Sequence, residues 1–386
     1  MLKRVYASNF RTLVNFNVEF DPLTLLLGPN GAGKTSIFEV VRLLRDFLRG
    51  EPAWVDGRMV SPTTTELFPL STLTRWQDVD VQSFELVLSG QGGEFAYRLE
   101  IEHERVRQRC RVRTEKLTFD KKLLFESSFN DNQLTAQLFR DDGSRGPTQL
   151  TDWTRSSLPS IQPREENQLM SWFKERMNRV IVARFNPAVI GARAADESPM
   201  LDWDASNFVA WFRQVANQDL ELVSKLRPLL QDVITGLVGL SLDPDGGDAK
   251  ILKAKFLAGA SAEAKSKPFF CRFDELSDGQ RVLLMLYTLL TAATDDSTIC
   301  IDEPENFVAL REINPWLNML LDKTQTTQSC QAILISHHPE LINALAVGSG
   351  RWIDRDGDAE SRAQSISEDS SELSIAELVS RGWLHV

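Results

Sequence analysis

Cysteine and histidine are both scarce in this sequence, with four of each among 386 residues. The cysteines stand far apart, so no pair has the spacing of a zinc site, and we expect them to stay reduced in the cytoplasm. They are Cys110, Cys271, Cys300 and Cys330. The sequence also lacks an apolar run near the ~20 residues that a membrane span needs, and its first residues lack the apolar core of a signal peptide. We therefore expect a cytoplasmic protein with no membrane partner.

Positive charge is in short supply as well, because 43 Lys and Arg stand against 54 Asp and Glu, for a net charge of −11. This balance excludes a surface coated with basic side chains for nucleic acid, although it leaves room for a local basic stripe. The hydrophobic fraction of 42% is ordinary for a globular protein, and the length suffices for two or three lobes with cores of their own.

The most specific motif is the glycine-rich segment "PLTLLLGPNGAGKTS" at 22–36. An apolar strand leads into a turn that matches G-x-x-x-x-G-K-[ST], with Gly28 as its first residue, and an amphipathic helix follows. Backbone N–H groups of such a turn wrap a phosphate, a lysine bridges two phosphates, and a Ser or Thr hydroxyl ligates Mg²⁺. The sequence therefore predicts a nucleoside triphosphate site with Mg²⁺. Its expected nucleotide-binding residues are Asn30, Gly31, Gly33, Lys34, Thr35 and Ser36, with Thr35 also a metal ligand.

Two later segments, "STICIDEPEN" at 297–306 and "QAILISHHPE" at 331–340, are apolar strands that end in polar residues. Neither strand alternates, so both suit the middle of a parallel sheet, whose functional residues lie at the carboxyl ends of its strands. We expect Asp302 to hold Mg²⁺, Glu303 to orient the attacking water, and His337 to contact the γ-phosphate. The alternative interpretation is a solvated strand end and a capped helix start before Pro339.

The loop "LSDGQ" at 276–280 is a second candidate anion cradle, because Ser277 and the Gly279 N–H precede an apolar helix. The order of these motifs resembles the ATP-binding-cassette (ABC) superfamily, with Walker A at 28–35, signature at 276–280, Walker B at 298–303 and a switch histidine at 337. In that superfamily the signature of one subunit completes the site of another. The resemblance therefore implies two chains that sandwich two ATP molecules head to tail, with Ser277, Gly279 and Gln280 acting in trans.

The opening "ASNFRTLVNFNVEF" and the Walker B sequence "IDEPEN" resemble the chromosome-repair and OLD-like branch of the superfamily (RecF, Rad50, SMC and OLD nucleases). This resemblance implies that Arg11 reaches the nucleotide. It also implies a glutamine at the Mg²⁺ site, for which Gln77 is our candidate and Gln82 the alternative. The expected fold class is α/β, an ABC-type head with a mixed sheet, flanking helices, an antiparallel β subdomain and a compact, mainly helical insertion.

Arginines recur at every second position from Arg105 to Arg113, after glutamates at every second position from Glu100 to Glu104. One interpretation is a DNA-backbone stripe on a strand. The other is a hairpin whose cross-strand Glu–Arg pairs neutralise the row, which we favour because no aromatics are interleaved for base stacking.

We divide the chain into 1–125 (N-terminal head), 126–265 (insertion), 266–360 (C-terminal head) and 361–386 (tail). Within the insertion we expect surface loops at 126–160 and helices at 165–180 and 205–237. The acidic run "DRDGD" at 354–358 is better explained by a hairpin turn than by a metal site. OLD nucleases carry a Toprim nuclease domain after the ATPase, and too few residues follow here for one, so we expect any nuclease on another chain.

By resemblance, the expected function is an ATP-hydrolysing switch that controls a separate effector, such as a nuclease, as in the anti-phage systems Septu and PARIS. Three alternatives remain: a DNA-repair ATPase that binds DNA directly, the ATPase subunit of a transporter, and a scaffold that binds ATP without turnover. The sequence after Walker B and the large insertion disfavour a transporter, and Glu303 with His337 disfavours a scaffold.

Overall fold

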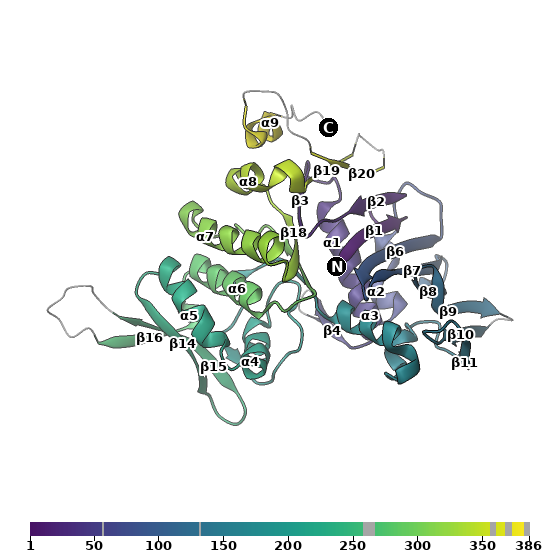
Figure 1. The fold of residues 1–386 in the computed structure, drawn as a ribbon, viewed down its shortest axis with the longest axis horizontal. Helices are drawn as coiled ribbons and strands as arrows, with labels where there is room; N and C mark the ends of the chain where they lie inside the picture. The colour runs from purple at the N-terminus through teal and green to yellow at the C-terminus, as the bar shows by residue number, and fades with distance from the viewer. Residues whose placement is uncertain (56–57, 131–132, 258–266, 356–359, 367–372, 382–386) are drawn as a thin grey trace.

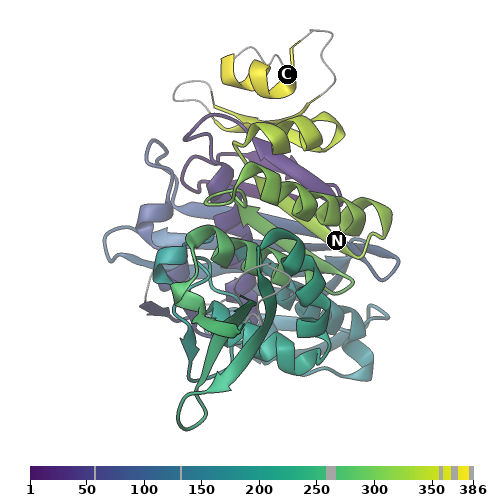
Figure 2. The same cartoon turned by 90° about the vertical axis from the view of Figure 1, so that its left-hand side faces the viewer.

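The computed structural model describes the chain except for residues 56–57, 131–132, 258–266, 356–359, 367–372 and 382–386 (Figure 1). No helix in the part that it describes is long and apolar enough to cross a membrane. Two sheets and their helices form the body of the molecule, and a smaller sheet projects from it (Figures 1 and 2).

A six-stranded sheet with five parallel strands forms the centre of the fold. Its order is β12 (Val180–Ala183), β17 (Ser297–Asp302), β18 (Cys330–Ile335), β3 (Leu23–Leu27), β19 (Gly350–Asp354) and the antiparallel β20 (Arg362–Ser365). Every residue of β3, β17 and β18 is buried, because helices cover both faces. The expectation of central parallel strands after the apolar runs is confirmed.

Each face of this sheet belongs to a different core. Leu23, Leu25 and Leu27 pack with the helices α6 (Asp278–Ala292), α7 (Leu310–Leu321) and α8 (Pro339–Ser349). Leu26 faces the opposite core, which contains the helix α1 (Lys34–Arg49) that follows the glycine-rich turn. The strand that delivers the glycine-rich turn is therefore fixed from both sides by apolar burial.

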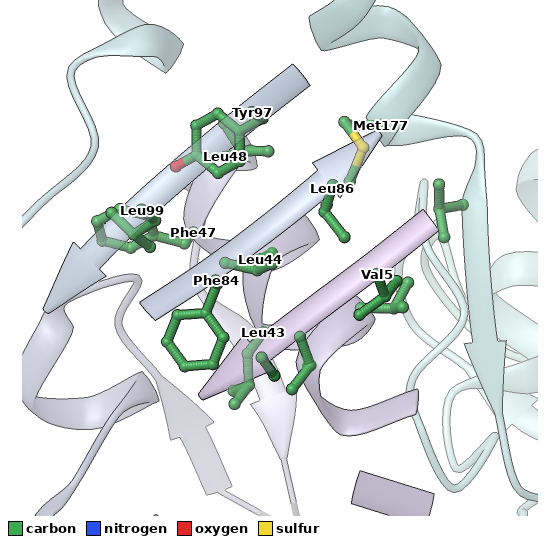
Figure 3. Packing of buried hydrophobic residues seen from close by; sticks show 14 of the residues in the cluster. Val5, Leu43, Leu44, Phe47, Leu48, Phe84, Leu86, Tyr97, Leu99 and Met177 are labelled. Atoms are coloured by element: carbon green, nitrogen blue, oxygen red, sulfur yellow. The ribbon is translucent and has the colours of Figure 1, made fainter. Parts of the chain in front are cut away.

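An eight-stranded antiparallel sheet covers the other side of α1. Its order is β11 (Arg145–Leu150), β10 (Gln133–Phe139), β9 (Lys122–Asn130), β8 (Arg109–Phe119), β7 (Gly93–Glu104), β6 (Val81–Gly90), β1 (Leu2–Ser8) and β2 (Phe16–Glu19). Figure 3 shows Leu44 and Phe47 of α1 packed among Phe84, Leu86 and Leu99 of this sheet. Helix α1 is thus held between two sheets.

The expected surface loops at 126–160 are in part wrong, since most of 126–150 forms β9, β10 and β11 at the edge of this sheet. Leu134 and Ala136 of β10 point into the core, while Gln133, Thr135 and Gln137 between and beside them are polar. The edge strand β11 is almost entirely exposed. Short half-polar strands carry a weak periodic signal, which explains the error.

The arginine row belongs to a hairpin, as favoured, but Arg105 and Arg107 lie in its turn rather than on a strand. Arg109 and Arg111 pair across the strands with Glu104 and Glu102 at 2.8 and 2.7 Å. The remaining pairs join Arg105 to Asp80, Arg107 to Glu104, and Arg113 to Glu100. The prediction of cross-strand neutralisation is confirmed.

The insertion contains the expected helices α3 (Gln168–Asn178), α4 (Phe208–Gln218) and α5 (Leu222–Val233). It also contains three strands of a small sheet that was not expected, whose fourth strand follows the insertion. That sheet is built from β13 (Arg193–Ala194), β14 (Leu237–Pro244), β15 (Lys250–Leu257) and β16 (Pro268–Arg272). Shorter elements are β4 (Ala53–Val55), β5 (Arg58–Val60), α2 (Thr64–Leu67) and α9 (Ile375–Arg381). Strands β19 and β20 pair antiparallel around 354–358, most of which lies outside the described residues.

Glu115 provides a pH-dependent test of this sheet. It is fully buried on β8, where Tyr97 donates its hydroxyl at 2.9 Å, and burial raises the pKa of Glu115 to about 7. The unfolded carboxyl ionises near pH 4.5, so this residue's contribution to stability is complete below that pH and is lost as pH rises through 7. Glu115→Gln should lack this loss, which amounts to about 2 kcal/mol between pH 5 and 8 in urea unfolding. Glu126→Gln, at a partly exposed carboxylate on β9, should keep the parent's pH slope, and parallel profiles for all three proteins would contradict the assignment.

Candidate active site

A cavity of about 390 Å³ opens where the carboxyl ends of β12, β17 and β18 meet the turn after β3. The structure brings the residues predicted from the glycine-rich turn, from β17 and from the loop after β18 to this one cavity. Those lining it are Arg11, Asn30, Gly31, Gly33, Lys34, Thr35, Ser36, Asp302, Glu303 and His337. Thr12, Arg184 and Ile335 line it too, and none of these three was predicted.

The turn between β3 and α1 is shaped for close approach of the backbone. Gly28 has φ +142°, and a Cβ there would lie 2.0 Å from the carbonyl oxygen of Ile353. Gly33 has φ +102°, and its Cβ would lie 2.8 Å from Thr12 Oγ1. Lys34 Nζ donates to the carbonyls of Gly28 at 2.7 Å and Pro29 at 3.0 Å, and burial lowers the pKa of Lys34. The turn thus holds a cation inside a ring of backbone, the geometry that cradles phosphates.

Hard oxygen donors lie beside this turn. Thr35 Oγ1 donates to Asp302 Oδ2 at 3.0 Å, which joins the start of α1 to the end of β17. Burial raises the pKa of Asp302, because its carboxylate has little solvent to stabilise the charge. A hydroxyl and a carboxylate next to a phosphate cradle are the donors that Mg²⁺ prefers, so the residues present fit this ion.

Glu303 sits in a strained backbone conformation, with φ +55° in a region that bulky residues rarely adopt. Its N–H donates to the carbonyl of Ile335 at 2.8 Å, which fixes the turn against β18. Its Oε2 accepts hydrogen bonds from Arg184 Nη2 at 3.1 Å and from Asn306 Nδ2 at 2.8 Å. The carboxylate is therefore aimed along the cavity edge and held from two sides.

Glu305 connects the loop after β17 to the loop after β18. Its Oε1 accepts from Ser336 Oγ at 2.7 Å and from the His337 N–H at 3.1 Å, while its buried Oε2 has no hydrogen-bond partner. Sequence reasoning missed Glu305, although a second glutamate in "DEPEN" was a visible signal. Burial and the nearby Lys34 lower the pKa of His337, so its ring is neutral near pH 7. His338 caps α8 instead, with Nδ1 accepting from the Glu340 N–H at 3.3 Å.

The two arginines of the cavity have different surroundings. Arg11 lies in the turn between β1 and β2, has φ +52°, and donates to Glu39 of α1 at 2.6 Å. Arg184 follows β12 and reaches Glu303 across the end of the sheet. It escaped prediction because β12 is short and lies inside the interval assigned to the insertion.

The two glutamine candidates are not brought to this cavity. Gln77 lies in a loop, where its carbonyl is a distant acceptor for Arg105 at 3.4 Å. Gln82 is buried in β6, where its Nε2 donates to the carbonyl of Asn9 at 3.0 Å and to Thr72 Oγ1 at 3.1 Å. Neither side chain lies with Thr35 and Asp302, so the geometry gives a glutamine metal ligand no support.

The loop at 276–280 also lies apart from the cavity. Ser277 caps α6, with its Oγ accepting from the Gln280 N–H at 3.3 Å and Gln280 Oε1 accepting from the Ser277 N–H at 3.1 Å. Ser277 is exposed, and Gly279 packs so closely on the Phe307 carbonyl that a Cβ would lie 2.7 Å away. Arg281, in the first turn of α6, donates to the carbonyl of Pro187 at 2.6 Å. This helix start faces outward while its side is tied to the segment after Arg184.

Residues 23–343 match the family model AAA_21, described as "AAA domain, putative AbiEii toxin, Type IV TA system". This match spans well over half of the chain. The chain belongs to the AAA_21 family. A segment of 44 residues is 48% identical to an OLD nuclease of Thermus scotoductus (strain ATCC 700910 / SA-01), and it covers 11% of this chain and only 8% of that nuclease.

The fold is similar to SMC heads over 95% of the chain. An SMC head bound to the C-winged helix domain of ScpA is covered to 98%, with a TM-score of 0.52 and 10% identity. An SMC head with an extended coiled coil, bound to the C-terminal domain of ScpA derived from Pyrococcus furiosus, is covered to 96%, with a TM-score of 0.52 and 9% identity. These likenesses concern the fold alone. With the family match and the OLD segment, they make this AAA_21 protein an ABC-type P-loop ATPase of the OLD/Rad50-like branch, which confirms the expected fold and enzyme class.

Steric crowding at Gly28 yields a prediction with a control in the same turn. Gly28→Ala should lower the free energy of unfolding by about 3 kcal/mol, because the added Cβ meets a backbone carbonyl that cannot move without shifting β19. Gly31→Ala, also at positive φ but with nothing within 4 Å, should cost only about 1 kcal/mol. Urea unfolding of the three proteins measures the difference, and equal losses for both variants would contradict the role given to the Ile353 carbonyl.

Proposed function

We propose that this ATPase is a switch in which two copies close head to tail around two ATP molecules and reopen after hydrolysis. The observation that carries the proposal is the separation between the cavity and the loop at 276–280. One chain holds the phosphate cradle, the candidate metal donors and Glu303, while its Ser277 is exposed elsewhere. A second copy related by a two-fold axis would supply Ser277, Gly279 and Gln280 to the cavity, and would receive the same from the first.

In this proposal each cavity residue has a distinct task. The cradle N–H groups and Lys34 bind the phosphates, Arg11 and Asn30 with Ser36 contact the nucleotide, and Thr35 with Asp302 would hold Mg²⁺. When bound, Mg²⁺ supplies charge neutralisation between the phosphates. Glu303 accepts a hydrogen bond from the attacking water and orients it. The neutral ring of His337 donates to the γ-phosphate. Glu305 fixes the backbone that carries this ring, because it accepts from the His337 N–H and from the Ser336 hydroxyl.

We further propose a cytoplasmic role in anti-phage defence, in which the ATP-closed pair restrains or releases a separate effector, most simply a nuclease. Two comparisons support this proposal. One segment of the chain is 48% identical to part of an OLD nuclease. The family description names a toxin–antitoxin system. Direct DNA binding has less support, because the arginine hairpin is paired with carboxylates throughout.

If two copies close around ATP, a variant that binds ATP but hydrolyses it slowly should accumulate as a dimer. Glu303→Gln with ATP and Mg²⁺ should double in mass from 43.6 kDa by light scattering. Its turnover should fall at least a hundredfold while binding persists, because the neutral amide is a weaker acceptor than the carboxylate and cannot take a proton from the water. The double variant Lys34→Ala/Glu303→Gln should stay monomeric, since it lacks the phosphate-binding cation. Turnover at the parent's rate, or a nucleotide-bound monomer, would contradict the proposal.

The proposal of a separate effector predicts that one partner protein binds the chain in a manner that depends on the ATP-closed state. Tagged Glu303→Gln, purified from the native host with ATP, Mg²⁺ and added nuclease to remove nucleic acid, should bring down one protein in stoichiometric amount, identified by mass spectrometry. The Lys34→Ala/Glu303→Gln chain is the control, and should recover a different amount of that protein. If the tagged chain returns alone, and gains partners only when DNA is left intact, the defence role fails and a DNA-repair role replaces it.

A further inference from the structure

Arg184 lines the candidate nucleotide cavity, just after a strand that the P-loop motifs do not include. It follows β12 directly, and β12 pairs in parallel with β17, so the two strands end at the same edge of the sheet. The backbone there is fixed, because the Arg184 N–H donates to the Trp203 carbonyl at 2.6 Å and the Asn186 N–H to the Asp204 carbonyl at 3.2 Å. The side chain, by contrast, is 51% exposed and free to change partners.

The cations that line the cavity differ in what holds them. Lys34 is bound by two carbonyls of its own turn, and Arg11 is paired with Glu39, which belongs to α1. Arg184 alone among these three is paired with Glu303, the carboxylate that the proposed function needs to be available to water. The same oxygen, Oε2, also accepts from Asn306. Glu303 therefore keeps one anchor if Arg184 leaves.

A terminal phosphate beside Lys34 is a stronger partner for Arg184 than a carboxylate. It carries more negative charge, and its oxygens match the planar guanidinium fork in a bidentate pair. A phosphate bound at Lys34 and the carboxylate of Glu303 would share one cavity with Arg184, since all three side chains line it. A diphosphate lacks the group that would reach this far, so the exchange depends on the third phosphate.

We propose that Arg184 is a positioning residue that binds the γ-phosphate and thereby releases Glu303 for the attacking water. Without a triphosphate, Arg184 pairs with Glu303 and neutralises it. With a triphosphate, the guanidinium moves to the phosphate, while Asn306 retains Glu303 at the cavity edge. After hydrolysis and loss of phosphate, the original ion pair forms again and resets the site. The release step rests on the water-orienting role of Glu303 in the proposed function, whereas phosphate binding by Arg184 does not.

A purely structural ion pair between Arg184 and Glu303 is the competing explanation, and a binding experiment in the Glu303→Gln background separates the two. In that background the ion pair is already gone and hydrolysis is suppressed. Arg184→Ala/Glu303→Gln should bind ATP with Mg²⁺ about tenfold more weakly than Glu303→Gln by isothermal titration, and should bind ADP equally well. Arg184→Lys should recover part of the ATP affinity, because it restores the charge without the fork.

Arg193 supplies a matched control. It lies nine positions further on, is 52% exposed, and pairs with Asp245 at 2.7 Å away from the cavity. Arg193→Ala/Glu303→Gln should bind both nucleotides like Glu303→Gln. In the parent background, Arg184→Ala should lower kcat at least tenfold, and Arg193→Ala should leave it unchanged.

The ATP and ADP affinities of these variants decide whether Arg184 binds the γ-phosphate. A selective loss of ATP affinity supports phosphate binding by Arg184. Unchanged ATP affinity, or equal weakening of ATP and ADP, overturns it and leaves a structural ion pair. If Glu303→Gln itself turns over ATP at the parent's rate, the proposed role of Glu303 fails, and a selective loss of ATP affinity on removing Arg184 would still stand.

Discussion

Burial of helix α1 between two sheets is the constraint on which the rest of this structure depends. Its buried apolar residues all belong to the core between the two sheets, and even Arg45 and Asp46 are buried. Arg45 donates to Asp46 at 2.9 Å and to the Val180 carbonyl at 3.1 Å, at the first residue of β12. A buried charge without its partner is costly, so this cluster fixes the rotation of α1 relative to β12. The glycine-rich turn at one end of α1 and Arg184, which follows β12, are therefore fixed in position relative to each other.

The location of the candidate active site follows from these fixed positions. Parallel strands end at one edge, so Lys34, Asp302 and His337 meet although they are far apart in the chain. Both glutamates in that space accept hydrogen bonds from neighbouring side chains. Glu303 rests against Arg184, and Glu305 against Ser336. Glu303 is thus held in a strained, hydrogen-bonded conformation.

The sequence was most informative where the candidate site residues belong to short contiguous motifs. The glycine-rich turn, Asp302 with Glu303, and His337 could be predicted because each follows a fully buried strand whose apolar run is easy to see. Arg184 and Glu305 could not be assigned, because their roles depend on which strands are neighbours and on loop-to-loop contacts. Strands β9 to β11 were missed, because one of their faces is polar. The choice of Gln77 shows the same limit, since a residue type alone does not fix the distance to Thr35.

The hydrogen bond from Arg281 to the Pro187 carbonyl has a consequence for communication between sites. Arg281 lies in the first turn of α6, beside Ser277, and Pro187 lies three residues after Arg184. A shift of the segment after β12 therefore acts directly on the start of α6. In a two-fold pair, the start of α6 from one copy would face the nucleotide of the other. Occupancy of one cavity would then alter affinity at its mate, and the pair would respond to ATP cooperatively, over a narrower concentration range than two independent sites.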